Sequence, residues 1–276
     1  MPMSPRTSPE KPALVLLHGL GMSAESAWGE VIPLLTDHHE VFAPNAVGHP
    51  GGPPAKRRPV TIADVVDAAE HYLDEHGLER PHLAGNSLGA FMAIELARRG
   101  RAATVCALSP AGFWIAGDGL QPQLLKTFKV ARTMARITRP ISPLVFRSAT
   151  LRRLTLRETA CHGDRLTADR ALKMSVEFLA SPSIIDIIDG SWQTAPLDAL
   201  PCPVTIVWSE HDATLPLAKY EANVRARLPQ AVFQVLPGVG HVPMFDDPGL
   251  VARTILATTG ATGPALRSHL GKDERG

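Results

Sequence analysis

The stretch HLAGNSLGAFMAIELA, residues 82–97, places a serine between two glycines, after a short apolar run and before a helical pattern. Gly85 and Gly89 allow the close backbone packing of a sharp strand-to-helix turn, where a Cβ atom would clash. A chain that turns in this way exposes the side chain at the turn, which here is Ser87. Because G-x-S-x-G also arises by chance, the rest of the sequence must support this interpretation.

Apolar runs alternate with helical patterns on both sides of this turn. The runs that predict buried strands are ALVLLHG from residue 13, EVFAP from 40, PHLAG from 81, ATVCALSP from 103, PVTIVWSE from 203 and AVFQVLPG from 231. Such an alternation predicts an α/β fold with a mostly parallel sheet, helices on both of its faces, and ligands at the carboxyl ends of the strands.

One long segment breaks the alternation. Residues 113–195 hold several helical stretches and no convincing strand, which predicts a helical cap inserted over the strand ends. The α/β core is then predicted to comprise residues 1–112 and 196–260. Residues 261–276 lack clear apolar periodicity and are predicted to form a tail.

Composition limits the function classes. The chain has 276 residues, of which 45% are hydrophobic, as in an ordinary globular protein. A net charge of +1 gives no reason to expect nucleic-acid binding. Three widely spaced cysteines, and histidines without ligand spacing, predict neither a structural disulfide nor a metal site. The polar, Pro-rich N-terminus is unlike a signal peptide and no apolar run reaches membrane-span length, so a cytoplasmic location is expected.

A serine nucleophile needs a base, usually a histidine, that a carboxylate orients. In this architecture the acid and the histidine are expected on loops that follow two late strands. Asp212 comes directly after PVTIVWSEH, and His241 follows AVFQVLPGVG. Glu210 lies on the same loop as Asp212 and competes with it as the acid.

Four motifs together resemble the α/β-hydrolase fold superfamily over nearly the whole chain. They are HGLG at 18–21, GNSLG at 85–89, WSEHD ending at Asp212, and GVGHVPMFDDP at 238–248. Only twelve residues precede the first apolar run, too few for the hairpin that opens the full-length fold, so a sheet of about six parallel strands is expected. Asn45 also departs from the family, whose members often have Asp there.

The resemblance implies a role for each site residue. Ser87 would be the nucleophile, His241 the general base and acid, and Asp212 the orienting carboxylate. The backbone N–H groups of Leu20 and Leu88 would form the oxyanion hole. Two further histidines, His18 and His49, are expected to shape their loops and not to titrate in catalysis.

The predicted cap is basic. From 117 to 180 the chain carries twelve Lys or Arg and five Asp or Glu. On one predicted helix, the spacing puts basic and apolar residues on different faces. The basic residues are Lys126, Lys129, Arg132, Arg136 and Arg139, and the apolar ones are Leu124, Val130, Met134 and Ile137. We favour a solvated lid helix whose apolar face packs on the core. The alternative is a basic face that attracts an anionic substrate, an acyl carrier or a membrane surface.

These observations predict a cofactor-free serine hydrolase, a monomer or weak homodimer, that cleaves a carboxylic ester of a small to medium apolar molecule through an acyl-enzyme. The residues expected to line its pocket are Phe113, Trp114, Phe128, Phe178 and Trp192. One alternative is a carbon–carbon bond hydrolase of the vinylogous diketone type, and another is a binding protein without turnover. Haloalkane dehalogenase and epoxide hydrolase activities are disfavoured, because those relatives carry Asp where this chain has Ser87.

Overall fold

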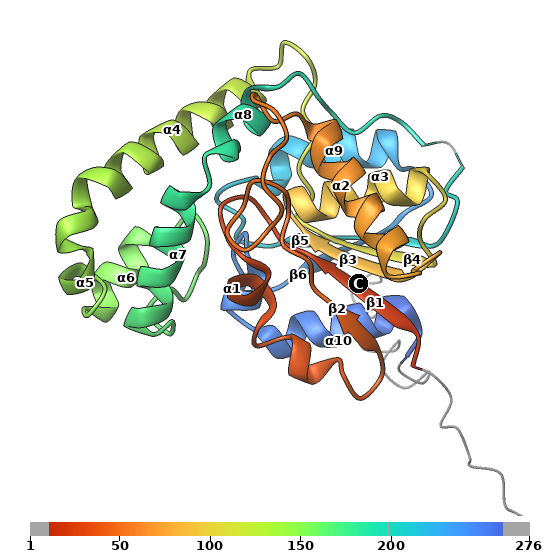
Figure 1. Ribbon diagram of the computed structural model, residues 1–276, viewed down its shortest axis with the longest axis horizontal. Helices are drawn as coiled ribbons and strands as arrows, with labels where there is room; N and C mark the ends of the chain where they lie inside the picture. Colours follow the sequence, from red (N-terminus) through yellow and green to blue (C-terminus); the bar gives the residue numbers. More distant parts are fainter. Residues whose placement is uncertain (1–10, 198, 262–276) are drawn as a thin grey trace, which may run out of the picture.

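A computed structural model describes residues 11–197 and 199–261 of the protein (Figure 1). In this part of the chain, six strands form one parallel sheet in the order β2-β1-β3-β4-β5-β6. The strands are β1 (Ala13–Leu17), β2 (Glu40–Phe42), β3 (His82–Asn86), β4 (Thr104–Leu108), β5 (Val204–Ser209) and β6 (Val232–Leu236). The predicted fold class and the sheet of about six parallel strands are therefore confirmed. The predicted tail lies outside the described residues, except for Ala261.

Helices cover both faces of the sheet (Figure 1). Those that pack on it are α1 (Ala24–Trp28), α2 (Ile62–Glu75), α3 (Leu88–Arg98), α9 (Leu217–Arg227) and α10 (Pro248–Thr259). Residues of α2, α3 and α9 build one apolar core, and residues of α1 and α10 build the other. On β1, Val15 and Leu17 face the first core, while Leu14 and Leu16 face the second. This explains the continuous apolar run, since a strand buried on both faces has no polar side.

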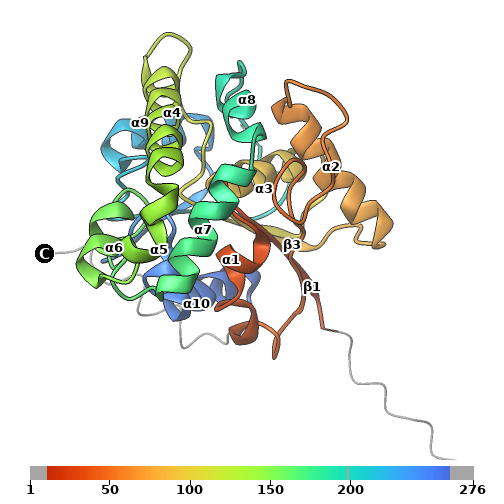
Figure 2. The same ribbon diagram turned by 60° about the vertical axis from the view of Figure 1, so that its left-hand side comes forward.

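Five helices lie between β4 and β5 in the sequence and form a lobe beside the sheet layers (Figure 1). They are α4 (Leu120–Thr138), α5 (Ser142–Val145), α6 (Ala149–Thr155), α7 (Ala168–Ala180) and α8 (Ser183–Asp189). We refer to them as the helical insertion. Figure 2 shows α4 and α7 as its two long neighbouring members. None of the described helices is long and apolar enough to cross a membrane.

Hydrogen bonds attach the helical insertion to loops at the carboxyl ends of the strands. The N–H of Val242 donates to the carbonyl of Thr159 at 2.9 Å, and the hydroxyl of Thr214 donates to the carbonyl of Glu158 at 2.6 Å. The buried carboxylate of Glu177 on α7 accepts bonds from the N–H and the hydroxyl of Ser23. These bonds attach α7 and the segment that precedes it to the loops after β1, β5 and β6.

The orientation of α4 differs from the prediction. Leu124 and Arg132 are its buried residues, whereas Val130, Met134 and Ile137 are exposed. The expectation that the apolar face of this helix packs on the core is therefore wrong for most of that face. Four of its five basic residues are exposed, and the exception is Arg132.

Arg132 explains part of this difference. Its guanidinium donates hydrogen bonds of 2.6–2.9 Å to the carbonyls of Phe178, Leu179 and Ser181. The last carbonyls of a helix have no partner within it, and those at the end of α7 receive theirs from this side chain. A basic residue that periodicity assigns to solvent is thus used to join α4 to α7.

Candidate active site

Ser87 lies at a strained turn between β3 and α3. Its φ of 55° and ψ of −112° belong to a region that L residues rarely adopt. A Cβ atom at Gly85 would lie 2.2 Å from the carbonyl oxygen of Gly89, and one at Gly89 would lie 2.0 Å from that of Leu17. Both glycines are therefore required by close backbone approach, and the turn presents the half-buried serine at the carboxyl end of the sheet.

Asp212 and His241 form a buried pair on the loops after β5 and β6. Atom Nδ1 of His241 lies 2.8 Å from Oδ2 of Asp212, and the two side chains are 8% and 0% exposed. An ionised carboxylate only accepts, so Nδ1 is the donor and Nε2 keeps its lone pair for a proton. The second oxygen of Asp212 accepts the N–H of Leu215 at 2.7 Å, which fixes the carboxylate plane.

Glu210 has a different position. Its side chain is 49% exposed, and one of its oxygens accepts the N–H of Gly238 at 2.8 Å. The structure therefore brings Asp212, and not the competing Glu210, to the ring of His241.

Ser87 and His241 border the same cavity, which has a volume of about 250 Å³. Its floor comes from the loops after β1 and β3, and its roof comes from α4, α6 and α7. Aromatic and aliphatic side chains form most of the roof, namely Phe128, Phe146, Leu156, Met174 and Phe178. In the described part of the chain, Glu158 contributes the one carboxylate to this lining, and no Lys or Arg belongs to it.

The five aromatic residues predicted for this pocket divide into two groups. Phe128 and Phe178 line the cavity, with ring centroids 6.1 Å apart. Phe113, Trp114 and Trp192 do not belong to its lining.

Phe113, Trp114 and Trp192 are instead buried in the apolar core that includes α3. The ring of Trp192 packs edge to face against Phe91 at 4.7 Å and Trp114 at 4.6 Å. The indole N–H of Trp114 donates to the carbonyl of Trp192 at 2.6 Å. Large aromatic side chains with a bonded polar tip are favourable core residues, and sequence alone does not separate them from pocket walls.

The residues predicted for the oxyanion hole lie on either side of Ser87. Leu20 lines the cavity on the loop after β1. Leu88 is the first residue of α3, where a helix leaves its backbone N–H groups without internal partners.

His18 fastens the loop that carries Leu20. Its Nδ1 lies 2.8 Å from the carbonyl of Gly19, and its Nε2 accepts the N–H of Ala46 at 2.9 Å. Burial lowers the pKa of His18 to about 4 and that of His49, whose ring packs against it, to about 3. Both rings are therefore neutral at neutral pH, as the acceptor role of Nε2 requires. The predicted loop-shaping role of the two histidines fits this arrangement.

Two positioning residues escaped the sequence analysis, although both lie in motifs that it quotes. Atom Nδ2 of Asn86 donates to the carbonyl of His241 at 2.9 Å. The carboxylate of Asp246 accepts the N–H of Gly240 at 2.8 Å and those of residues 161 and 162 in the insertion. Together they fix the loop that carries the histidine. The available signal was their position, since Asn86 directly precedes Ser87 and Asp246 follows His241 by five residues.

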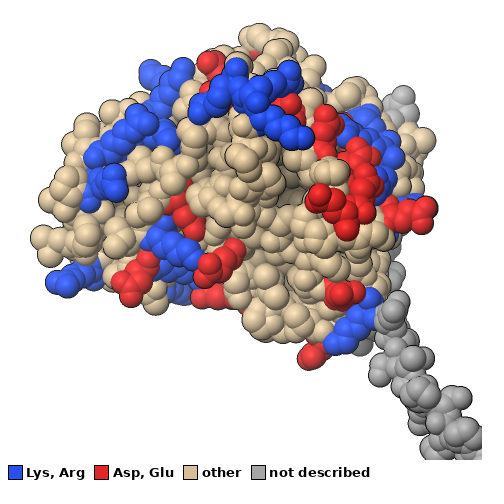
Figure 3. Space-filling model, in the orientation of Figure 1, with Lys and Arg blue, Asp and Glu red and all other residues tan. Residues whose placement is uncertain are grey.

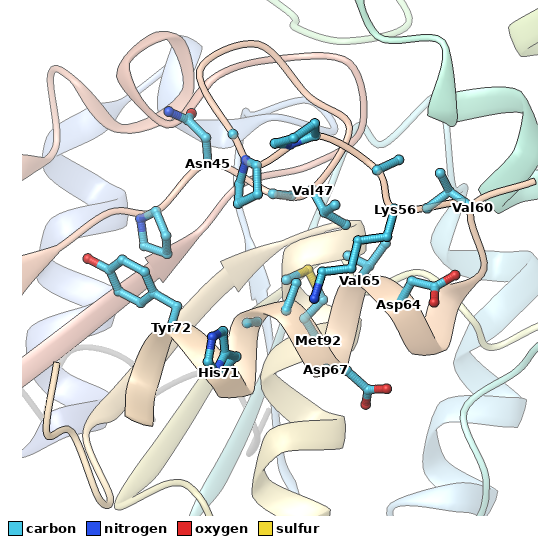
Figure 4. Close-up of a pocket in the computed structure, with 18 of the residues that line it drawn as sticks. Asn45, Val47, Lys56, Val60, Asp64, Val65, Asp67, His71, Tyr72 and Met92 are labelled. Carbon is cyan, nitrogen blue, oxygen red and sulfur yellow. The ribbon is translucent and has the colours of Figure 1, made fainter. Parts of the chain in front are cut away.

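A larger cavity, of about 730 Å³, lies between the loop after β2 and helix α2 (Figure 4). Val47, Val65 and Met92 form part of its apolar wall, and the charged side chains of Lys56 and Asp67 also line it. Neither Ser87 nor His241 belongs to its lining. The smaller cavity is therefore the candidate active site.

With this geometry established, comparison with known proteins identifies the class. The model of the alpha/beta hydrolase family matches residues 14–254, so the chain belongs to that family of hydrolases. It is 28% identical over 214 residues to epoxide hydrolase EphH from Mycobacterium tuberculosis, across 76% of this chain and 100% of that protein.

Two solved structures share the fold. The 2-hydroxy-6-oxo-6-phenylhexa-2,4-dienoate hydrolase BphD from Rhodococcus sp. strain RHA1 superimposes with a TM-score of 0.70 at 20% identity, covering 91% of each chain. An esterase from Thermogutta terrifontis does so with a TM-score of 0.66 at 22% identity, covering 90% of this chain and 89% of the other. At these identities the likeness establishes the fold alone.

Proposed function

We propose that the protein is a serine hydrolase that cleaves a carboxylic ester of a small to medium apolar molecule through an acyl-enzyme. The observation that carries this proposal is the buried pair of Asp212 and His241 beside the cavity that also holds Ser87. In such a set the serine attacks, the histidine moves the proton, and the carboxylate holds the histidine in the productive tautomer.

The reaction has two halves. Nε2 of His241 takes the Ser87 proton as Oγ attacks the ester carbonyl, and the tetrahedral intermediate then expels the alcohol, which receives that proton. Water next attacks the acyl-enzyme, with His241 again as base, and the acid leaves as Ser87 is restored. The N–H groups of Leu20 and Leu88 would stabilise the oxyanion in both halves, and losing one such donor typically costs ~10²–10³ in rate.

The cavity favours a neutral acyl group of modest size. Its volume of about 250 Å³ lies below the ~300–1,000 Å³ of sites for drug-sized ligands. A dienoate substrate of a carbon–carbon bond hydrolase would bring a carboxylate to this lining. Among the residues that the structure describes, the lining includes the carboxylate of Glu158 and no Lys or Arg. Arg132, the buried cation of α4, is already engaged by three carbonyls.

Despite the similarity to an epoxide hydrolase, we do not propose epoxide opening for this protein, because Ser87 does not suit that reaction. Opening of an epoxide through a covalent intermediate needs a carboxylate nucleophile, because the ester formed can be hydrolysed. Attack by the hydroxyl of Ser87 on an epoxide carbon would leave an ether that water does not cleave. Ser87 therefore supports acyl transfer.

The test is hydrolysis of p-nitrophenyl esters from acetate to decanoate by the unaltered protein, Ser87→Ala and the exposed control Ser191→Ala. We expect turnover that favours the shorter acyl chains, loss of at least ~10³-fold in Ser87→Ala, and little change in the control. Turnover of a coloured dienoate without ester turnover would replace the proposal with the carbon–carbon hydrolase. Ligand-induced thermal stabilisation without product would replace it with the binding protein.

A further inference from the structure

Exposed apolar side chains gather on one part of the helical insertion. Among the described residues twelve large hydrophobic side chains are exposed, and seven of them, 41–69% exposed, lie between positions 130 and 154. They are Val130, Met134, Ile137, Ile141, Leu144, Leu151 and Leu154. We call this region, from α4 to α6, the α4–α6 surface. Contiguous exposed apolar area on a folded protein marks an interaction site.

The geometry of α4 shows where the exposed apolar side chains lie relative to the active-site cavity. Val130, Met134 and Ile137 follow one another at spacings of four and three, so they form a stripe along one side of the helix. Thr127 and Ala131, each three residues before a stripe member, line the active-site cavity. The outward stripe and the cavity roof are therefore adjacent faces of one helix.

The same segment is cationic. Residues 126–153 contain eight Lys or Arg and no Asp or Glu. Arg132 and Arg152 are bound to backbone carbonyls, and the other six are exposed: Lys126, Lys129, Arg136, Arg139, Arg147 and Arg153. Figure 3 shows the Lys and Arg side chains along α4, whereas many Asp and Glu side chains gather on the side of α2.

We propose that the α4–α6 surface binds an anionic lipid bilayer, with the apolar stripe in the interface and the surrounding cations on the lipid headgroups. An apolar stripe flanked by Lys and Arg is the pattern of a helix that lies in a membrane surface. A second copy of the chain fits less well. Two such surfaces would repel each other, and acids of α2 such as Glu70 and Asp74 already pair with Arg99 and Arg101.

Binding at this surface would place the cavity beside the lipid. The roof residues of α4 would then lie next to the interface from which an apolar ester enters. Only this consequence rests on the proposed ester hydrolysis, whereas binding to the bilayer does not.

The test is sedimentation of the full chain with sucrose-loaded vesicles of phosphatidylcholine, alone or with one quarter phosphatidylglycerol. We expect binding to the anionic vesicles at least ~10-fold stronger than to the neutral ones, and weakened by 0.5 M salt. Ile137→Glu and Lys129→Glu should each reduce it at least ~5-fold. Their controls, Leu34→Glu and Lys219→Glu, change exposed residues outside the surface and should bind as the unaltered protein does.

Failure to sediment with anionic vesicles would overturn the proposal, as would equal binding by Ile137→Glu and Leu34→Glu. Self-association on gel filtration that Ile137→Glu abolishes, without vesicle binding, would assign the surface to a second copy instead. Ser87→Ala should bind vesicles normally, so a failed ester assay and a failed vesicle assay are separate results. Circular dichroism establishes that each variant is folded.

Discussion

Helices α3 and α4 show how differently two helices of this chain are used. Nine of the eleven residues of α3 are buried, whereas two of the nineteen residues of α4 are. Helix α3 is enclosed by the sheet and by α2, and its first turn fixes the position of Ser87. Helix α4 covers the cavity with one side and exposes apolar and basic side chains on another.

The difference separates two tasks. Burial around α3 leaves its backbone little freedom, which suits a site that must hold reacting groups in place. Exposure of α4 leaves its outer residues free to vary without loss of the core. The sheet loops are thus expected to determine the chemistry, and the insertion to determine which molecules reach it.

The largest expected effect lies on the loop that carries Asp212. Asp212→Asn should reduce ester hydrolysis by ~10⁴-fold, because the amide no longer holds His241 in the required tautomer. Glu210→Gln, on the same loop, should stay within about two-fold, since its side chain bonds to the backbone of Gly238. The values of kcat/KM for a p-nitrophenyl ester measure both. Equal losses of kcat/KM in the two variants would contradict the assignment of Asp212 as the acid.

A second test concerns the turn that begins α3. Gly89→Ala should cost more than about 4 kcal/mol of the free energy of unfolding, because its Cβ would meet the backbone of Leu17. Gly77→Ala is the matched control, with a φ of 65° but open space, and should cost about 1 kcal/mol. Urea denaturation compares them. Similar costs would mean that conformation, and not close approach, requires glycine at 89.

Acid sensitivity should arise at the loop of His18. Its pKa is about 4 in the folded protein against 6.5 when unfolded, so the unfolded chain binds more protons between these values. Stability should therefore fall as pH falls from 6.5 to 4, by about 3 kcal/mol for this group. His18→Gln, whose carbonyl can still accept the N–H of Ala46, should flatten the dependence of Tm on pH. An unchanged pH profile would contradict the buried neutral histidine.

The smallest expected effect lies in the insertion. Arg132→Met leaves three carbonyls without their donor and should lower the free energy of unfolding by about 1–3 kcal/mol. Arg136→Met, one turn away and exposed, should stay within about 0.5 kcal/mol. Thermal denaturation distinguishes them. Equal losses of stability in the two variants would mean that Arg132 lies on the solvated face that the sequence periodicity predicts.

These contrasts also explain which parts of the fold could be predicted from sequence. The strands could be predicted because burial on both faces requires continuous apolar runs. The turn at Ser87 could be predicted because backbone clashes leave only glycine at positions 85 and 89. Which face of α4 is buried could not be predicted. Its apolar stripe resembles a core face in sequence, and nothing local shows that Arg132 has partners at the end of α7.

The candidate site was predictable to a similar degree. Chain order and motif placed Asp212 and His241 on loops that the fold brings together. Phe128 and Phe178 line the cavity, whereas Trp114 lies in the core. Sequence does not separate the two groups, because pocket walls and core share the same apolar chemistry. The role of Asp246 was hidden, since it acts through backbone bonds between segments far apart in the sequence.

The most direct test of the central claim is to trap the covalent intermediate. The protein is mixed with p-nitrophenyl butyrate, quenched in acid within the first turnovers, and examined by intact mass spectrometry and peptide mapping. We predict a mass increase of one butyryl group on the peptide that contains Ser87, absent in Ser87→Ala. Ester turnover with the butyryl group on another residue, or undiminished in Ser87→Ala, would contradict the assignment of Ser87 as the nucleophile.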